Sequence, residues 1–97
     1  MIVKISRASV DAGEMEKLKS WLSKEWQPLI RHQRGLARFF VLAKDSGEFA
    51  VITLWDNGES MESWNNNVEH KKIVKTLLPL LTSELSSEVY NRIEFDS

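Results

Sequence analysis

Two neighbouring segments of the chain are apolar on both of the faces that a β-strand presents. Residues 36–44 (LARFFVLAK) and 48–55 (EFAVITLW) are joined by the turn signal Asp-Ser-Gly, which predicts an antiparallel hairpin. Successive side chains of a strand point to opposite faces, so Phe39 and Phe40 are expected on different sides of the sheet. A sheet with helices on one side only usually carries polar residues on the other side. The pattern therefore predicts a sheet that is covered on both faces.

The remaining segments predict how many helices and strands accompany this hairpin. Strand-like alternation marks both ends of the chain, and helical spacing of apolar residues marks the segments between them. The predicted order is strand, helix, strand, strand, helix, helix, strand, over residues 2–10, 15–30, 36–44, 48–55, 59–66, 69–84 and 86–95. This β-α-β-β-α-α-β order is typical of an α+β, ferredoxin-like fold with a four-stranded antiparallel sheet. The helices are too few to cover both faces, so we expect a homodimer in which the partner subunit covers the second face.

Particular residues predict where the helices begin and break. Asp11 and Glu14 have the spacing of a capping box. Pro28 is expected to kink or shorten the first helix near its end, and Pro79 to disturb the last turn of the third. The asparagine run at residues 65–67 lowers helix propensity and predicts the break between the second and third helices.

Composition and charge exclude several classes of protein. The 97 residues predict one domain over 1–97, and a net charge of −1 argues against nucleic-acid binding. A solvated helix face is the expected role of Lys71, Lys72 and Lys75. There is no cysteine, which excludes disulfides and thiolate chemistry. No apolar run is long enough to span a membrane and no signal-peptide pattern is present, so a cytoplasmic location is expected.

Trp55, Trp64 and His70 are the residues that point most directly to a functional site. Trp55 ends the strand at 48–55, and Trp64 and His70 are expected on the apolar sides of the next two helices. Indole rings in such positions either fill a core or form the walls of a pocket for a flat ligand. An inward imidazole either moves a proton near neutral pH or is a buried group held by a backbone carbonyl or in a capping role.

Other candidates for the site are weaker. Trp21 belongs to the same aromatic set, and Asn65 offers amide donors and acceptors next to Trp64. Tyr90 is expected to be either a surface residue or a group at a pocket mouth that stabilises an enolate or phenolate. His32 lies in a polar run at a helix end and is expected on the surface. Two histidines cannot build a multi-histidine metal site within one subunit, so no metal is expected.

The segments VKISRASVDAG, GLARFFVL and ITLWDNGESMESWNNNVEHKK together resemble the antibiotic biosynthesis monooxygenase (ABM) family. The resemblance covers nearly the whole chain. In the family an aromatic residue ends the third strand, an aromatic or histidine follows, and a histidine comes a few residues later. Trp55, Trp64 and His70 match these positions. The resemblance implies a dimeric α+β barrel with a site between the sheet and the helices of each subunit.

The resemblance also implies a chemistry. Members include oxygenases without a cofactor, in which an aromatic substrate of the anthrone or quinol type is deprotonated and then reacts directly with O2. Carried onto this sequence, Trp64 would orient the substrate ring and His70 would move the proton. The residues expected to contact the substrate are Trp55, Asn65, Trp21, Tyr90 and Ser6. The alternative function is a binding protein of the same fold that catalyses nothing.

Two departures from the family pattern limit what is transferred. Many members that act on small hydroxylated substrates have histidine where this chain has Trp64. A haem-degrading branch has tryptophan there, with an asparagine on its first strand and a histidine ligand further into the third helix. In this sequence the first position is Ser6, and the second falls on Ile73 or Val74. Haem binding is therefore the weakest of the three expectations.

Overall fold

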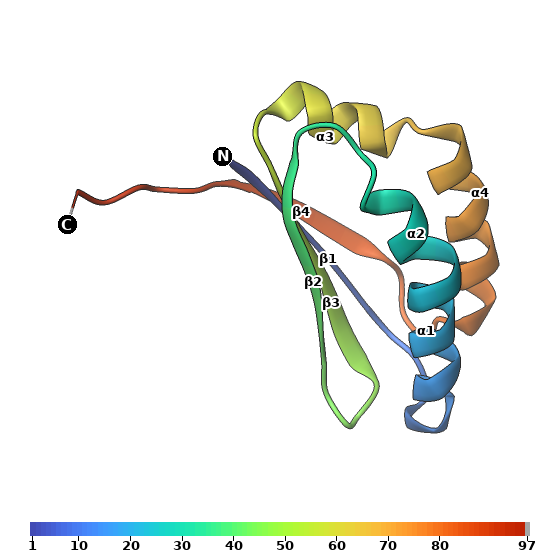
Figure 1. Ribbon diagram of the computed structural model, residues 1–97. Helices are drawn as coiled ribbons and strands as arrows, with labels where there is room; N and C mark the ends of the chain where they lie inside the picture. Colours follow the sequence, from blue (N-terminus) through green and yellow to red (C-terminus); the bar gives the residue numbers. More distant parts are fainter. Residues whose placement is uncertain (97) are drawn as a thin grey trace.

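The computed structural model describes residues 1–96 and has one sheet with all of its helices on one side (Figure 1). The elements in chain order are β1 (Ile2–Ser9), η1 (Ala12–Glu14), α1 (Met15–Trp21), η2 (Leu22–Trp26), α2 (Gln27–Ile30), β2 (Leu36–Ala43), β3 (Glu48–Trp55), α3 (Gly58–Asn65), α4 (Val68–Leu77), η3 (Leu78–Leu80) and β4 (Ser86–Asn91). The four strands pair antiparallel in the order β2-β3-β1-β4. The predicted α+β, ferredoxin-like fold is confirmed.

The strand register decides which side chains face the helices. Ser6 of β1 lies opposite Val51 of β3, and Val51 lies opposite Val41 of β2. The residues on this face are buried or half-buried, and on β1 and β3 they are Ile2, Lys4, Ser6, Ala8, Phe49, Val51, Thr53 and Trp55. The helices thus cover a mostly apolar face that contains one lysine.

The opposite face of the sheet, here called the open face, is also apolar. It carries Val3, Ile5, Phe40, Leu42, Ile52 and Leu54. Phe40 is 41% exposed and Leu42 is 56% exposed. The described chain therefore leaves uncovered the face for which the sequence predicts a cover.

Two apolar clusters join the helices to the sheet. The first holds Ala8, Val10, Leu18, Phe49 and Leu77, at the end of the sheet where β3 begins. The second holds Trp26, Ile30, Trp55, Met61 and Trp64. Trp55 and Ile30 have no exposed surface. Because β3 contributes to both clusters, it is the strand on which the helical layer rests.

The first helix differs from its prediction at both ends. The capping box was predicted wrongly, since the Asp11 side chain makes no cap hydrogen bond. The N–H of Glu14 instead donates to the main-chain carbonyl of Asp11 at 2.8 Å, within a 3-10 turn. Pro28 does not shorten the helix, which continues to Ile30. Proline cannot donate to the carbonyl four residues before it, and the π-helical turn η2 just before it accommodates that lost bond.

The predicted break at residues 65–67 is confirmed. Helix α3 ends at Asn65 and α4 begins at Val68. Asn67 is the N-cap of α4, and its side-chain oxygen accepts from the N–H of His70 at 2.9 Å. Asparagine is among the residues that favour this position. The segment between the two helices thus supplies the N-cap of α4, and this cap also fixes the backbone of His70.

The C-terminal elements are shorter than predicted. Helix α4 ends at Leu77 and a 3-10 turn contains Pro79, which has no N–H to continue the α-helical pattern. Strand β4 ends at Asn91, which pairs with Ile2, the first residue of β1, and the last backbone bond between the two segments runs from the N–H of Arg92 to the carbonyl of Met1 at 3.0 Å. Ile93 and Phe95 consequently lie outside the strand, 75% and 86% exposed. Across residues 1–96 no helix has the length and apolar character needed to cross a membrane.

The buried position of Ile30 yields a test of the fold. Ile30→Ala removes three carbon atoms from a side chain with no exposed surface and is expected to lower the free energy of unfolding by about 3 kcal/mol. Chemical denaturation measures this value. The matched control is Val68→Ala, because Val68 is 63% exposed and its truncation should change stability by less than about 0.5 kcal/mol. Equal effects of the two changes would contradict the described core.

Candidate functional site

A cavity of about 390 Å³ lies between the sheet and the helices. Its sheet side is formed by β1, β3 and β4, and its helix side by residues from α1, η2, α3 and α4. The lining includes five of the residues predicted for the site: Ser6, Trp21, Trp64, Asn65 and His70. A cavity of this size and apolar character is typical of small-molecule sites.

His70 is held from two directions by the break between α3 and α4. Its ring stacks on the indole of Trp64, with ring centroids 3.8 Å apart and planes at 11°. Its Nδ1 lies 2.9 Å from the carbonyl oxygen of Trp64. Together with the cap bond from Asn67, these contacts fix both the backbone and the ring of His70. The sequence left open whether His70 is a proton carrier or a residue held by a carbonyl, and this geometry is compatible with both.

The Trp64 carbonyl determines the tautomer of His70. A carbonyl oxygen only accepts hydrogen bonds, so Nδ1 must carry the hydrogen. In the neutral ring Nε2 is then the unprotonated nitrogen. Burial lowers the pKa of His70 below its ordinary value of 6.5, the bond to the Trp64 carbonyl opposes this, and the charge of Lys4 lowers the pKa further. At neutral pH the imidazole is therefore neutral, with Nε2 available as a base.

Lys4 is the main residue of the cavity that sequence reasoning missed. Its Nζ donates to the Asn65 side-chain oxygen at 2.6 Å. Burial lowers the pKa of Lys4, while the carboxylate of Glu62 acts in the opposite direction. The signal was present in the sequence, because Lys4 lies two residues from both Ile2 and Ser6 and so shares their face of β1. A lysine on a strand is usually assigned to the solvent side, which hid it.

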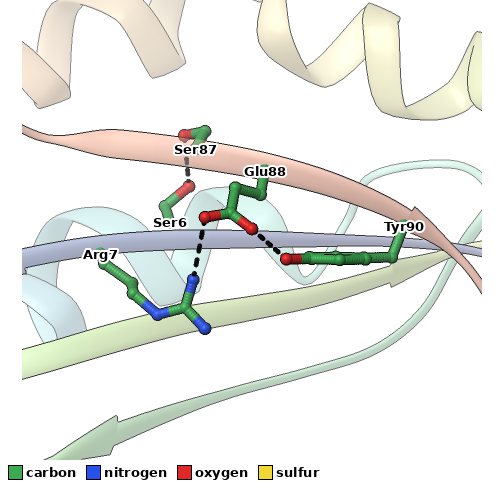
Figure 2. A network of polar contacts seen from close by, with 5 residues as sticks. All are labelled: Ser6, Arg7, Ser87, Glu88 and Tyr90. Carbon is green, nitrogen blue, oxygen red and sulfur yellow. Dashed lines mark hydrogen bonds and ion pairs between the residues drawn. The ribbon is translucent and has the colours of Figure 1, made fainter.

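Two further predicted residues line the cavity with their polar groups already bonded. The indole N–H of Trp21 donates to Thr76 Oγ1 at 2.9 Å and lies 3.2 Å from the carbonyl oxygen of Ile73. This N–H therefore connects α1 to α4. The hydroxyl of Ser6 bonds to the hydroxyl of Ser87 on β4 at 2.8 Å, as Figure 2 shows. Trp21 thus presents ring surface to the cavity, and Ser6 presents a hydroxyl pair.

The structure places Trp55 and Tyr90 away from the cavity lining. Trp55 is fully buried in the second cluster, and its indole N–H donates to Thr53 Oγ1 at 2.9 Å. Tyr90 lies on the open face, 48% exposed, and its hydroxyl donates to Glu88, which pairs with Arg7 at 3.6 Å (Figure 2). Tyr90 shares a face of β4 with Glu88, and the register of Tyr90 with Val3 of β1 places that face away from the helices.

Comparison with known proteins bears on the family. The family model described as antibiotic biosynthesis monooxygenase matches residues 1–76, most of the chain. The chain belongs to the ABM family. The match includes the cavity residues from Lys4 to Lys75, whereas Tyr90 lies beyond it. No curated protein matches the sequence.

Solved structures of ABM-type proteins share the fold. A Deinococcus radiodurans protein, named provisionally as an antibiotic biosynthesis monooxygenase, has 21% identity and a TM-score of 0.85, covering 100% of this chain and 97% of its own. A similarly named Nitrosomonas europaea protein has 20% identity and a TM-score of 0.82, covering 97% of this chain and 100% of its own. Rv0793 from Mycobacterium tuberculosis has 15% identity and a TM-score of 0.80, covering 99% of this chain and 98% of its own. At these identities the likeness shows the fold alone.

The lowered pKa of His70 predicts how stability depends on pH. The unfolded chain binds a proton at His70 near pH 6.5, whereas the folded chain binds it only at lower pH. The stability contributed by neutral His70 is thus present above about pH 6.5. It is lost as the pH falls from there towards the lower pKa that His70 has in the folded chain. Urea denaturation measures the free energy of unfolding. Between pH 7.5 and 5 this free energy should fall less in His70→Gln than in the wild type. His32→Gln changes an exposed histidine, so its free energy of unfolding should fall with pH by the part that is due to His70. The same dependence of this free energy on pH in all three proteins would contradict the burial of His70.

Proposed function

We propose that this ABM-family chain is a cofactor-independent monooxygenase that oxidises a small aromatic compound of the quinol, anthrone or polyketide type with O2. The observation that carries the proposal is the fixed, neutral His70 in an apolar cavity. Its Nδ1–H is committed to the Trp64 carbonyl at 2.9 Å, which leaves Nε2 as a base. The cavity of about 390 Å³ suits a flat ring system.

In this proposal His70 starts the reaction by removing a proton from the substrate. Nε2 accepts the proton from an acidic C–H or O–H, and the resulting carbanion or phenolate is electron-rich enough to react with O2 directly. For an anthrone-type methylene, one oxygen atom becomes the product carbonyl and the other leaves as water. The apolar walls keep bulk water from the anion. The chain's own residues therefore supply the base, the orientation and the dry surroundings.

Trp64 acts mainly through His70. The indole is only 2% exposed, and one of its faces is covered by the imidazole. Its other neighbour is Trp55, with centroids 6.5 Å apart. We therefore assign Trp64 the positioning of the base, whereas sequence reasoning gave it the orientation of the substrate ring. The more accessible ring of Trp21 is better placed to contact a ligand.

Oxygen uptake by chelator-treated protein tests these roles against a panel of quinols, anthrones and polyhydroxyaromatics. His70→Ala should lower kcat about 100-fold or more, because a positioned general base contributes at least that much. Trp64→Phe should lower kcat by about 10-fold, since a smaller ring holds the imidazole less firmly. His32→Ala, at an exposed position, should retain the wild-type rate. Full rates in both site variants would refute the assignment.

A binding protein without catalysis is the second candidate. The observation that favours it is that the described lining contains no carboxylate, so besides lysines His70 is the one group able to exchange protons there. Such a protein would bind panel compounds without any protein-dependent oxygen uptake. Haem binding gains no support, because Ile73 and Val74 stand where the resemblance expects an iron ligand, and their side chains have no atom that ligates iron.

We propose further that the active form is a homodimer built on the open face. This face presents Phe40 and Leu42 to solvent in the single chain, and soluble monomers rarely expose a large contiguous apolar patch. The segment after β4 runs away from the sheet (Figure 1) and carries the exposed Ile93 and Phe95. A second copy would cover both features.

Sedimentation at micromolar concentration tests the dimer. The wild type should sediment at twice the chain mass of 11.2 kDa. Leu42→Glu places a charge at a position that is 56% exposed in the single chain, so the fold should survive while the dimer dissociates. Gln27→Glu, exposed on α2, is the control and should remain dimeric. A folded wild-type monomer would contradict this proposal.

A further inference from the structure

The charged groups of the cavity all have one sign. Three lysines contribute to its lining, Lys4 from β1 and Lys71 and Lys75 from α4, and the described lining contains no aspartate or glutamate. The sequence predicted a solvated helix face for Lys71, Lys72 and Lys75, and all three are exposed. Only Lys72 among these has an ion-pair partner, Glu69, in the described chain. An apolar cavity with only positive charges has a positive potential, which low-dielectric walls strengthen.

Lys4 is the lysine on the inner side of the cavity. It is half-buried on the helix-facing side of the sheet, and its ammonium is directed by the Asn65 oxygen 2.6 Å away. No carboxylate in residues 1–96 lies within ion-pair distance of it. An ammonium has three donors, so the bond to Asn65 leaves two of them for another partner. The chain therefore holds a half-buried cation without a direct ion pair, and the Glu62 carboxylate acts on it only from beyond ion-pair distance.

Such a cation is costly unless an anion accompanies it. Desolvation disfavours the charged lysine, as the lowered pKa of Lys4 indicates. A ligand oxygen that bears a negative charge would supply the missing ion-pair partner, and charge-assisted hydrogen bonds are roughly twice as strong as neutral ones. The aromatic rings of Trp21 and Trp26 in the same lining suit an aromatic body on that anion.

We propose that the cavity selects an aromatic compound that carries one negatively charged oxygen, and that Lys4, directed by Asn65, binds this oxygen. The proposal rests on the function proposed above and names the charge state of its substrate class. Lys71 and Lys75 lie at the solvent-exposed side of the lining, where they attract the anion. Lys4 thus binds the charged oxygen, and His70 remains the group that moves a proton.

Binding of two matched compounds tests the proposal without any turnover. Hydroxynaphthoquinone is an anion at neutral pH, and its methyl ether is neutral and nearly isosteric. Both are titrated under anaerobic conditions, and quenching of the cavity tryptophans reports binding. The wild type is expected to bind the anion at least about 10-fold more tightly than the ether. Equal affinities, or no binding of either compound, would overturn the proposal.

Variants locate the preference at Lys4. Lys4→Met keeps the length of the side chain and removes its charge, so the ratio of the two affinities should fall to about one while the ether still binds. Lys4→Arg should retain a preference for the anion. Lys24→Met, at an exposed lysine of η2 outside this lining, should leave the ratio unchanged. A wild-type ratio in Lys4→Met would overturn the role of Lys4, and its thermal unfolding curve verifies that the variant is folded.

A second pair of compounds identifies the kind of oxygen. Naphthoate and its methyl ester repeat the comparison with a carboxylate in place of an acidic hydroxyl. A larger ratio for the hydroxyquinone pair supports a phenolate or enolate ligand, and a larger ratio for the naphthoate pair supports an aromatic acid. Oxygen uptake is measured separately, so loss of anion selectivity and loss of oxygenase activity are independent results.

Discussion

The helical layer is joined to the sheet where Trp64 packs between Trp55 and His70. Trp55 is fully buried at the end of β3, and its indole lies 6.5 Å from that of Trp64. The imidazole of His70 stacks on the indole of Trp64, with ring centroids 3.8 Å apart. Removing the ring of Trp55 or Trp64 would open a gap in the second cluster. The same contacts that stabilise the fold therefore determine where the imidazole of the cavity lies.

The stack also explains why this histidine suits proton transfer. Helix α3 ends at Asn65, and the carbonyl of Trp64, which accepts from the N–H of Asn67 at 3.1 Å, also accepts from Nδ1 of His70 at 2.9 Å. The side-chain oxygen of the N-cap Asn67 accepts from the N–H of His70. A helix break thus supplies both a hydrogen-bond acceptor and a fixed backbone. Burial lowers the pKa of the imidazole, and the charge of Lys4 adds a smaller effect in the same direction.

Much of the fold was predictable from the sequence because it depends on local patterns. Alternation in residues 36–55 predicted the hairpin and its two apolar faces, and the asparagine run predicted the helix break. The short β4 was not predictable, because its end is determined by where β1 begins, at Ile2. The π-helical turn before Pro28 was likewise not predictable from composition. It forms because the helix continues past a proline that cannot make its hydrogen bond.

The candidate site was predictable only in part. Helical spacing placed Trp64 and His70 on inward faces, but it could not show that one ring covers the other. Lys4 was missed although it shares a face of β1 with Ile2 and Ser6, because a lysine on a strand is usually assigned to the solvent side. Tyr90 was weighed as a surface residue or a group at a pocket mouth, and the register with Val3 of β1 places it on the open face. Ring stacking and strand register depend on long-range contacts, which local patterns do not contain.

The central claim is that His70 is a neutral base with Nε2 unprotonated, and nitrogen NMR of the imidazole tests it most directly. Spectra of labelled protein at pH 7.5, assigned by comparison with His70→Gln, distinguish protonated from unprotonated ring nitrogens. The account predicts a protonated Nδ1 and an unprotonated Nε2 for His70. A protonated Nε2, whether in the other tautomer or in an imidazolium ion, would contradict it.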